Sequence, residues 1–142
     1  YHFASREALI AAVREWSAEQ LGKAFASTDT PENRTRYITR FVLENPEVVA
    51  LWTEDLLSPG RIVDRYPAFD AMAAGFDQHF AKDARCEGMD GQAYATFLLT
   101  WAMLAPRIYR NSVRSDISID EMVERLTRTH MAILRQSGIV DM

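Results

Sequence analysis

Three side chains able to ligate a metal ion recur at helical spacing in the second half of the chain. His79, Asp83 and Cys86 are spaced i, i+4 and i+7, which predicts that they share one helix face and could supply metal ligands. This spacing is common by chance, and no second group of such residues accompanies it. We therefore expect neither a metal site nor a cofactor. Cys86 is the only cysteine, which excludes an internal disulfide and fits a reducing cytoplasm.

Known sequence motifs for catalysis are missing from the 142 residues of the sequence. There is no Gly-x-Ser-x-Gly nucleophile motif, no glycine-rich phosphate loop and no zinc signature. An enzyme is therefore not expected, although catalytic groups can lie far apart in sequence. His130 falls on the apolar face of a helical pattern, where a core or interface histidine is the usual outcome. Its alternative role is a pH-sensitive charge at an interface.

The composition is that of a globular protein with a sizeable core. The 142 residues are 48% hydrophobic and 25% charged, which suits one domain. No apolar run approaches the length of about 18 residues that a membrane span needs. The net charge of −4 makes these residues poor at binding nucleic acid by themselves, because DNA requires a concentrated positive face.

Apolar residues recur at helical spacing throughout, so we expect an all-α bundle of about six helices. Ser5, Thr30-Pro31-Glu32 and Asn45-Pro46-Glu47 mark three helix starts, and Ser27–Asp29 and Ser58-Pro59-Gly60 mark two ends. A short turn follows at 61–65, and a helix is expected over 67–85.

The last two helices have the clearest signals. Asp90 precedes a long apolar segment that Pro106 should kink. Ser118 and Glu121 form a capping box, Ile117 can pack against Met122, and Gly138 can end the helix. The first helix should bury Leu9, Val13 and Trp16, with Ile10, Leu21 and Phe25 beside them.

The opening run Tyr1-His2-Phe3-Ala4-Ser5-Arg6-Glu7-Ala8-Leu9 resembles a junction in TetR-family (tetracycline-repressor-like) transcriptional regulators. In that family an aromatic-His-Phe motif followed by a capping Ser closes the helix-turn-helix and starts the next helix. The rest of the chain is similar to the family in architecture only, with two long helices at its end.

The resemblance implies that residues 1–4 are the remnant of a recognition helix and that 5–142 form a ligand-binding and dimerisation domain. DNA would be bound only through an N-terminal segment that precedes Tyr1. By the same resemblance, Tyr1, His2 and Arg6 would contact DNA phosphates, and Phe3 would pack in the helix-turn-helix core. Phosphate contacts only position a reading helix, so these residues would have little function without the segment that precedes them. The alternative is that Tyr1, His2 and Arg6 form a frayed terminus.

Aromatic residues on the inward stripes of successive helices are the candidates for a ligand site. Core packing accounts for most of them, but apolar ligands also bind between the helices of a bundle. The resemblance favours an internal site for a small-molecule effector of apolar or aromatic character. The predicted walls are Trp16, Tyr37, Phe41, Trp52, Phe76, Tyr94, Phe97 and Trp101. Polar candidates are Glu54, Asp55, Gln20 and Thr100, for which a solvated face or a core partner is an equal alternative.

The final two helices carry more apolar residues than one core-facing stripe needs. A helix that is apolar over much of its circumference is buried on two sides, and a twofold-related copy can supply the second. The resemblance implies a four-helix bundle with two helices from each subunit. The predicted interface residues are Met103, Met122, Val123, Leu126, His130, Ile133 and Leu134, and the alternative is a thick core in one chain.

The function that the resemblance implies is a ligand-responsive, cytoplasmic transcriptional regulator that acts as a homodimer without a membrane, and we expect it to be a repressor. Ligand binding would move the first full helix, which joins the DNA-binding head to the pocket. The alternative is a stand-alone helical dimer for ligand binding or protein interaction, without DNA binding. A small helical enzyme ranks third.

Overall fold

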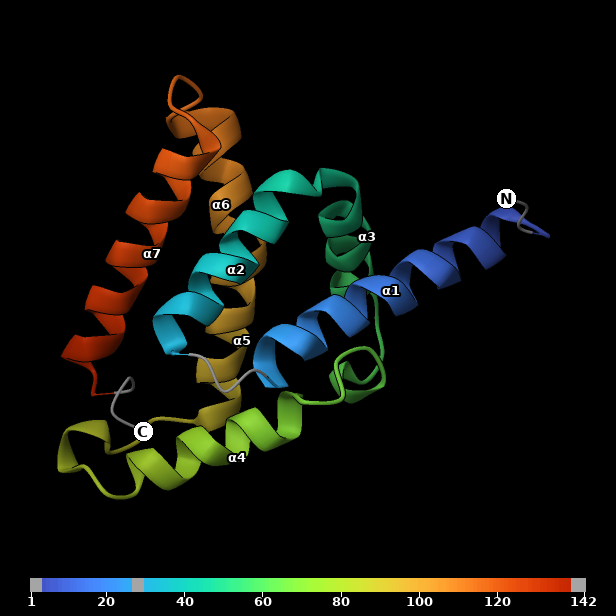
Figure 1. The fold of residues 1–142 in the computed structure, drawn as a ribbon. Coiled ribbons are helices and arrows are strands. Elements are labelled where there is room, and N and C mark those ends of the chain that lie inside the picture. Colours follow the sequence, from blue (N-terminus) through green and yellow to red (C-terminus); the bar gives the residue numbers. More distant parts are fainter. Residues whose placement is uncertain (1–3, 27–29, 139–142) are drawn as a thin grey trace.

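The fold of the chain is all-α, as the sequence predicts (Figure 1). The computed structural model describes residues 4–26 and 30–138, except for the side chains of 21 and 24–26. The α-helices are α1 (Arg6–Ala26), α2 (Pro31–Glu44), α3 (Pro46–Leu57), α4 (Phe69–Phe80), α5 (Gly91–Met103), α6 (Ala105–Ile108) and α7 (Ile119–Gln136). Short 3-10 turns cover Ile62–Asp64 and Ala84–Cys86, and a π-turn covers Tyr109–Val113. Within the described ranges, no helix combines the length and apolar character needed to cross a bilayer.

Helix starts fall where the capping residues predict them. The side-chain oxygens of Ser5, Thr30, Asp90 and Ser118 accept hydrogen bonds from backbone amides at 2.9–3.2 Å. Each bond satisfies one of the free amides of a helix N-terminus. Ile117 packs against the buried cluster that contains Met122. The predicted first helix end at Ser27–Asp29 lies outside the described residues.

Two predicted helices are shorter in the structure. The helix expected over 67–85 spans Phe69–Phe80, because the Asp83 carboxylate accepts from the Arg85 amide at 2.9 Å and starts a separate 3-10 turn. The long helix after Asp90 is interrupted at Leu104 rather than only kinked. Pro106 is the second residue of α6. Proline has no N–H, so it cannot donate the hydrogen bond that would continue α5 into α6.

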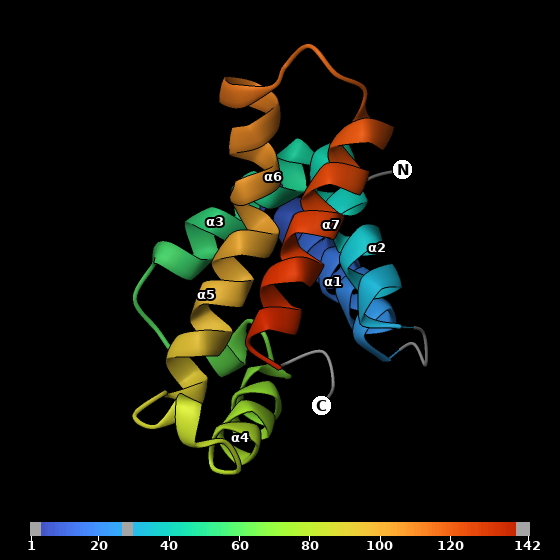
Figure 2. The same cartoon turned by 90° about the vertical axis from the view of Figure 1, so that its left-hand side faces the viewer.

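Helix α2 lies at the centre of the fold and packs against both α5 and α7 (Figures 1 and 2). It runs antiparallel to α7. The Arg36 guanidinium lies 2.7 Å from the Glu124 carboxylate, and that of Arg40 lies 2.7 Å from Asp120. Helix α4 packs across α5 at the other end of the molecule.

Helix α1 packs less closely than its sequence predicts. Its N-terminal end projects beyond the other helices (Figure 1). Among its described side chains only Ser17 is buried, while Leu9 and Trp16 of the expected inward stripe are exposed. The helix is held by α2 and α3, and the Arg14 guanidinium lies 2.8 Å from the Asp55 carboxylate of α3.

Candidate functional site

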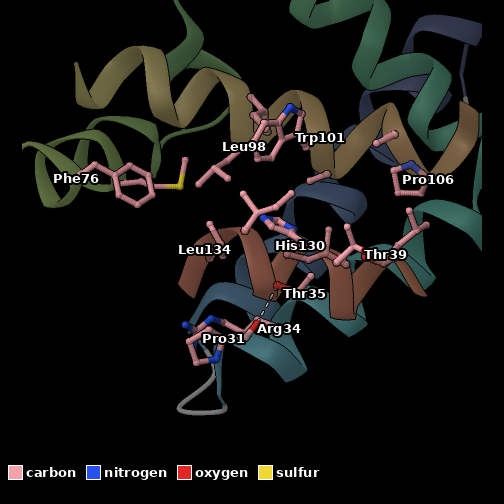
Figure 3. Close-up of a pocket in the computed structure, with 18 of the residues that line it drawn as sticks. Pro31, Arg34, Thr35, Thr39, Phe76, Leu98, Trp101, Pro106, His130 and Leu134 are labelled. Carbon is pink, nitrogen blue, oxygen red and sulfur yellow. Dashed lines mark hydrogen bonds between the residues drawn. The ribbon is translucent and has the colours of Figure 1, made fainter. Parts of the chain in front are cut away.

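An apolar cavity of about 460 Å³ opens between α2, α5 and α7 (Figure 3). Its volume lies within the range of pockets that hold small organic molecules. Met72 and Phe76 of α4 close one end, and Ala105 and Pro106 of α6 close the other. The remaining wall residues are Pro31, Arg34, Thr35, Ile38, Thr39, Tyr66, Leu98, Leu99, Trp101, Ala102, Leu126, Thr129, His130, Ile133 and Leu134.

The cavity exists because α5 and α7 are held apart. Each packs along α2, but their backbones approach each other closely at few points. The small side chains of Thr35, Thr39 and Ala102 line the space between them. Across it, the ring of Trp101 meets that of His130 edge-on, with centroids 6.0 Å apart and planes at 79°. The helices thus form two walls over a floor made by α2.

Hydroxyl groups give the cavity a few hydrogen-bond acceptors. Thr35 Oγ1 donates to the Pro31 carbonyl at 2.9 Å, and Thr129 Oγ1 donates to the Arg125 carbonyl at 2.8 Å. Since each hydroxyl has one proton, these oxygens can offer a ligand only their lone pairs. Most of the remaining wall is apolar.

His130 is the most unusual polar group of the wall. Its Nε2 is buried, and no group in the described part of the chain forms a hydrogen bond with it. Burial lowers the pKa of this imidazole below its usual 6.5, which favours the neutral ring at neutral pH. Leaving a buried ring nitrogen without a partner costs free energy. The ring of His130 lines the cavity, but its Nε2 atom is not accessible from it.

The cavity wall contains cationic but no carboxylate side chains. Arg34 lines it from the first turns of α2, and neither Asp nor Glu is among the wall residues. Tyr66 also lines it, and burial raises the pKa of its phenol to about 12, so that this group stays neutral. The wall is therefore electrostatically suited to neutral or anionic molecules.

Two of the eight predicted ligand residues, Phe76 and Trp101, line the cavity. Tyr94 packs behind the wall, with its ring centroid 4.8 Å from that of Phe76. Tyr37 and Phe97 are exposed on the surface. Helical periodicity placed these residues near the right elements but did not predict which direction each ring faces.

The other three, Trp16, Phe41 and Trp52, form an aromatic cluster on the opposite side of α2. The Phe41 centroid lies 5.8 Å from the ring of Trp16 and 5.7 Å from the ring of Trp52. The Trp52 indole N–H donates to Ser17 Oγ at 2.8 Å, which joins α3 to α1. Trp52 packs on a core cluster that includes Ile38, and Ile38 and its neighbour Ala102 also line the cavity. The aromatic cluster therefore lies directly behind the cavity wall.

The predicted interface residues separate into two groups. Leu126, His130, Ile133 and Leu134 line the cavity. Met103, Met122 and Val123 are buried by this chain's own helices, and so is Leu134. An intersubunit surface would have to use their exposed neighbours instead, because side chains already covered within one chain have no area left to bury.

The remaining sequence candidates lie away from the cavity. Arg6 is the exposed first residue of α1, while Tyr1 and His2 lie outside the described residues. Thr100 is exposed, and its hydroxyl donates to the Thr96 carbonyl. Glu54 is exposed, and Gln20 is not among the wall residues. Because α4 ends at Phe80, His79, Asp83 and Cys86 do not share one helix face, and no metal-binding group of three such residues occurs within the described ranges.

Sequence reasoning missed most of the polar wall residues. Arg34, Thr35 and Thr39 on α2, and Thr129 on α7, are not aromatic and were not candidates. The available signal was the recurrence of small and polar residues at helical spacing on α2. Comparisons with protein-family models, curated proteins and solved structures find no match to this chain.

Proposed function

We propose that this chain is the effector-binding part of a ligand-responsive transcriptional regulator, and that its cavity binds a small, mainly apolar molecule. The observation that carries the proposal is the cavity itself, which three helices line and whose wall includes His130, an imidazole with no hydrogen-bond partner for its Nε2 among the described residues. Convergent polar groups in an apolar pocket are typical of ligand sites.

The regulatory role rests on the resemblance of residues 1–9 to TetR-family proteins and on the position of α1. Its link to the cavity is short: Ser17 bonds to Trp52, and Trp52 packs on the cluster that contains the wall residue Ile38. Displacement of this wall by a ligand would shift the support of α1, which is lightly packed. We place this regulator in the cytoplasm, consistent with its single free cysteine.

Homodimerisation is the second part of the proposal. Phe97 and Trp101 on α5, Ala105 and Ile108 on α6, and Ile133 on α7 are exposed. The α5 and α6 residues are spaced four, four and three residues apart, which forms one stripe along successive turns. An apolar surface on neighbouring helices is typical of a protein–protein interface.

Ligand binding can be tested with N-phenyl-1-naphthylamine, a neutral aromatic probe that fluoresces in apolar surroundings. The wild-type chain should bind it saturably. Ala102→Phe should weaken binding by at least about tenfold, because the new ring fills the cavity. Ala105→Phe is a second block, since Ala105 is exposed at the edge of the cavity and its change does not enter the core.

Ala93→Phe is the matched control, because Ala93 is exposed on the same helix as Ala102 but does not line the cavity. Equal probe binding by all four proteins would contradict the cavity as the site. Hydrogen exchange then tests the regulatory part: bound probe should change the protection of α1 amides. Protection changes restricted to the cavity walls would favour the alternative, a ligand-binding protein without output through α1.

A further inference from the structure

We propose that the ligand of this cavity is an uncharged apolar molecule with one hydroxyl or carbonyl oxygen, and that this oxygen forms a hydrogen bond with the hydroxyl of Thr39. This inference rests on the proposed ligand-binding function and specifies the chemistry of the ligand. The apolar body would occupy the space between α5 and α7, and the oxygen would lie against α2, the floor of the cavity.

Thr39 combines deep burial with a hydroxyl that has no partner. The residue is 6% exposed and lines the cavity, where it is labelled in Figure 3. Its Oγ1 forms no hydrogen bond within the described part of the chain. The fully covered side-chain atoms without a partner in that part are Arg14 Nε, His79 Nε2, Thr127 Oγ1 and His130 Nε2. Thr39 Oγ1 is not one of them, so it has accessible surface. Because Thr39 lines the cavity and is otherwise covered, this surface faces the cavity.

The two other wall threonines of the described residues have already used their protons. Thr35 Oγ1 donates to the Pro31 carbonyl, and Thr129 Oγ1 donates to the Arg125 carbonyl. Thr39 keeps both its proton and its lone pairs for a ligand. A hydrocarbon ligand would remove water from this hydroxyl and return no hydrogen bond, which costs free energy. The cavity therefore favours a ligand that brings a polar group to Thr39.

One oxygen on the ligand is enough to satisfy Thr39. Its hydroxyl can donate to a carbonyl or hydroxyl oxygen, and it can also accept from a ligand hydroxyl. The groups next to it are apolar: Ile38 precedes it on α2, and Ala102 of α5 packs on the cluster that contains Ile38. A second polar group on the ligand at this point would lose its water without compensation.

The surroundings of Thr39 favour an uncharged group. A hydroxyl is one neutral donor, which does not offset the loss of water around an ionised group. No Asp or Glu lines the cavity within the described part of the chain, so an ammonium group would have no counter-ion. Arg34 lies five residues before Thr39, about 7.5 Å along the axis of α2, and it already has another interaction. A carboxylate bonded to Thr39 would therefore lack a dedicated positive charge.

Two probes of nearly the same shape test the proposal: 2-naphthol, and 2-methylnaphthalene, in which a methyl group replaces the hydroxyl. Dissociation constants are measured by calorimetry and by displacement of N-phenyl-1-naphthylamine. Thr39→Val should weaken the binding of 2-naphthol about 3- to 10-fold, as expected for the loss of one hydrogen bond. It should leave the affinity for 2-methylnaphthalene unchanged or higher. Comparing the two changes removes the difference in hydrophobicity between the probes.

The controls assign the effect to the hydroxyl and to the cavity. Thr39→Ser keeps a hydroxyl and should retain most of the affinity for 2-naphthol. Thr96→Val should change neither affinity, because Thr96 is exposed on α5 and does not line the cavity. Ala102→Phe and Ala105→Phe should abolish binding of both probes. Thr39→Ala removes the same hydroxyl and takes the place of Thr39→Val if that variant does not fold.

The failures of the two proposals differ. Equal changes in affinity for 2-naphthol and 2-methylnaphthalene in Thr39→Val, with both probes lost in the blocked variants, would overturn the role of Thr39 and leave the cavity a ligand site. Tighter binding of 2-naphthoate than of 2-naphthol at pH 7 would overturn the uncharged ligand. Binding of no probe by the wild-type chain would overturn the proposed ligand-binding function as well.

Discussion

Thr127 and His130, one turn apart on α7, each bury a polar atom that has no hydrogen-bond partner within the described part of the chain. Their surroundings differ. Thr127 is 1% exposed and lies inside the core, whereas His130 lines the cavity. The threonine hydroxyl therefore has no access to a ligand, and its burial is a plain cost to stability.

Replacing Thr127 with Val should stabilise the protein by up to about 1 kcal/mol. The valine has nearly the same shape, and it removes a hydroxyl that is desolvated without compensation. The measurement is the free energy of unfolding in urea. Thr129→Val is the control: its hydroxyl is exposed and donates to the Arg125 carbonyl, so its change should stay within about 0.5 kcal/mol. A clear loss of stability in Thr127→Val would mean that this hydroxyl has a partner.

His130 should make the stability of the unliganded protein fall with decreasing pH from about 6.5 downward. Burial lowers its pKa in the folded state below 6.5, so the unfolded state takes up the proton first. Its stabilising contribution is complete above pH 6.5 and is lost as the pH falls toward the lower folded pKa. Urea unfolding between pH 7.5 and 5.5 measures this slope.

The slope should become smaller in His130→Leu. Asp83 and Asp116 do not interfere, because arginine partners lower the pKa of each carboxyl from 3.8 to about 2, and their contributions change only below this window. A slope that is the same in both proteins would show that His130 is not desolvated.

The contact of α4 with α5 depends on one residue without a side chain. The Gly91 amide donates to the Asp77 carboxylate at 2.7 Å. A Cβ at Gly91 would lie 2.2 Å from the Ala73 carbonyl oxygen, a distance that requires the backbones to separate. Gly91 therefore sets how closely the two helices approach at this end of the cavity.

Gly91→Ala should destabilise the protein by about 1–3 kcal/mol, because α5 must move away from α4. Gly75→Ala is the matched control. It lies inside α4, and a new Cβ there would meet nothing within 4 Å, so it should stabilise by about 0.5–1 kcal/mol through its helix propensity. Thermal and urea unfolding of the two variants give the comparison, and equal effects would contradict the close approach at Gly91.

The helices could be predicted from sequence where one residue determines their boundary. Thr30, Asp90 and Ser118 cap helices by bonds to amides two or three residues away, so short-range sequence contains the whole signal. The end of α4 was predicted too late, since periodicity continues past Phe80 and only the Asp83 bond shows the break.

The site was less predictable, because it depends on spacing between helices. Phe76 and Trp101 were found by their type and phase. The cavity, however, arises from the separation of α5 and α7, which no local pattern encodes. Aromatic type alone also selected Trp16 and Trp52, whose partners lie on the other side of α2.

At the scale of the whole molecule, the exposed apolar stripe predicts a dimer that charge should break. Phe97 is 57% exposed and Ile108 is 55% exposed, and neither lines the cavity. Phe97→Glu with Ile108→Glu should convert a dimer to a monomer, because two like charges would face each other across a twofold axis. Sedimentation velocity measures the mass. Leu57→Glu, on an exposed leucine of α3, is the control, and a wild-type monomer at high concentration would contradict the interface.

Trp101 and Ala105 belong at once to the cavity wall and to the exposed stripe. A second copy seated on that stripe would cover the same side chains that a ligand touches from within. By mass action, ligand binding and self-association would then be linked. A ligand that stabilises the dimer would bind more tightly to the dimer than to the monomer, and the two effects would have the same free energy. The effective affinity of the cavity would depend on how much of the protein the cell contains, and sensitivity would be set by abundance as well as by chemistry.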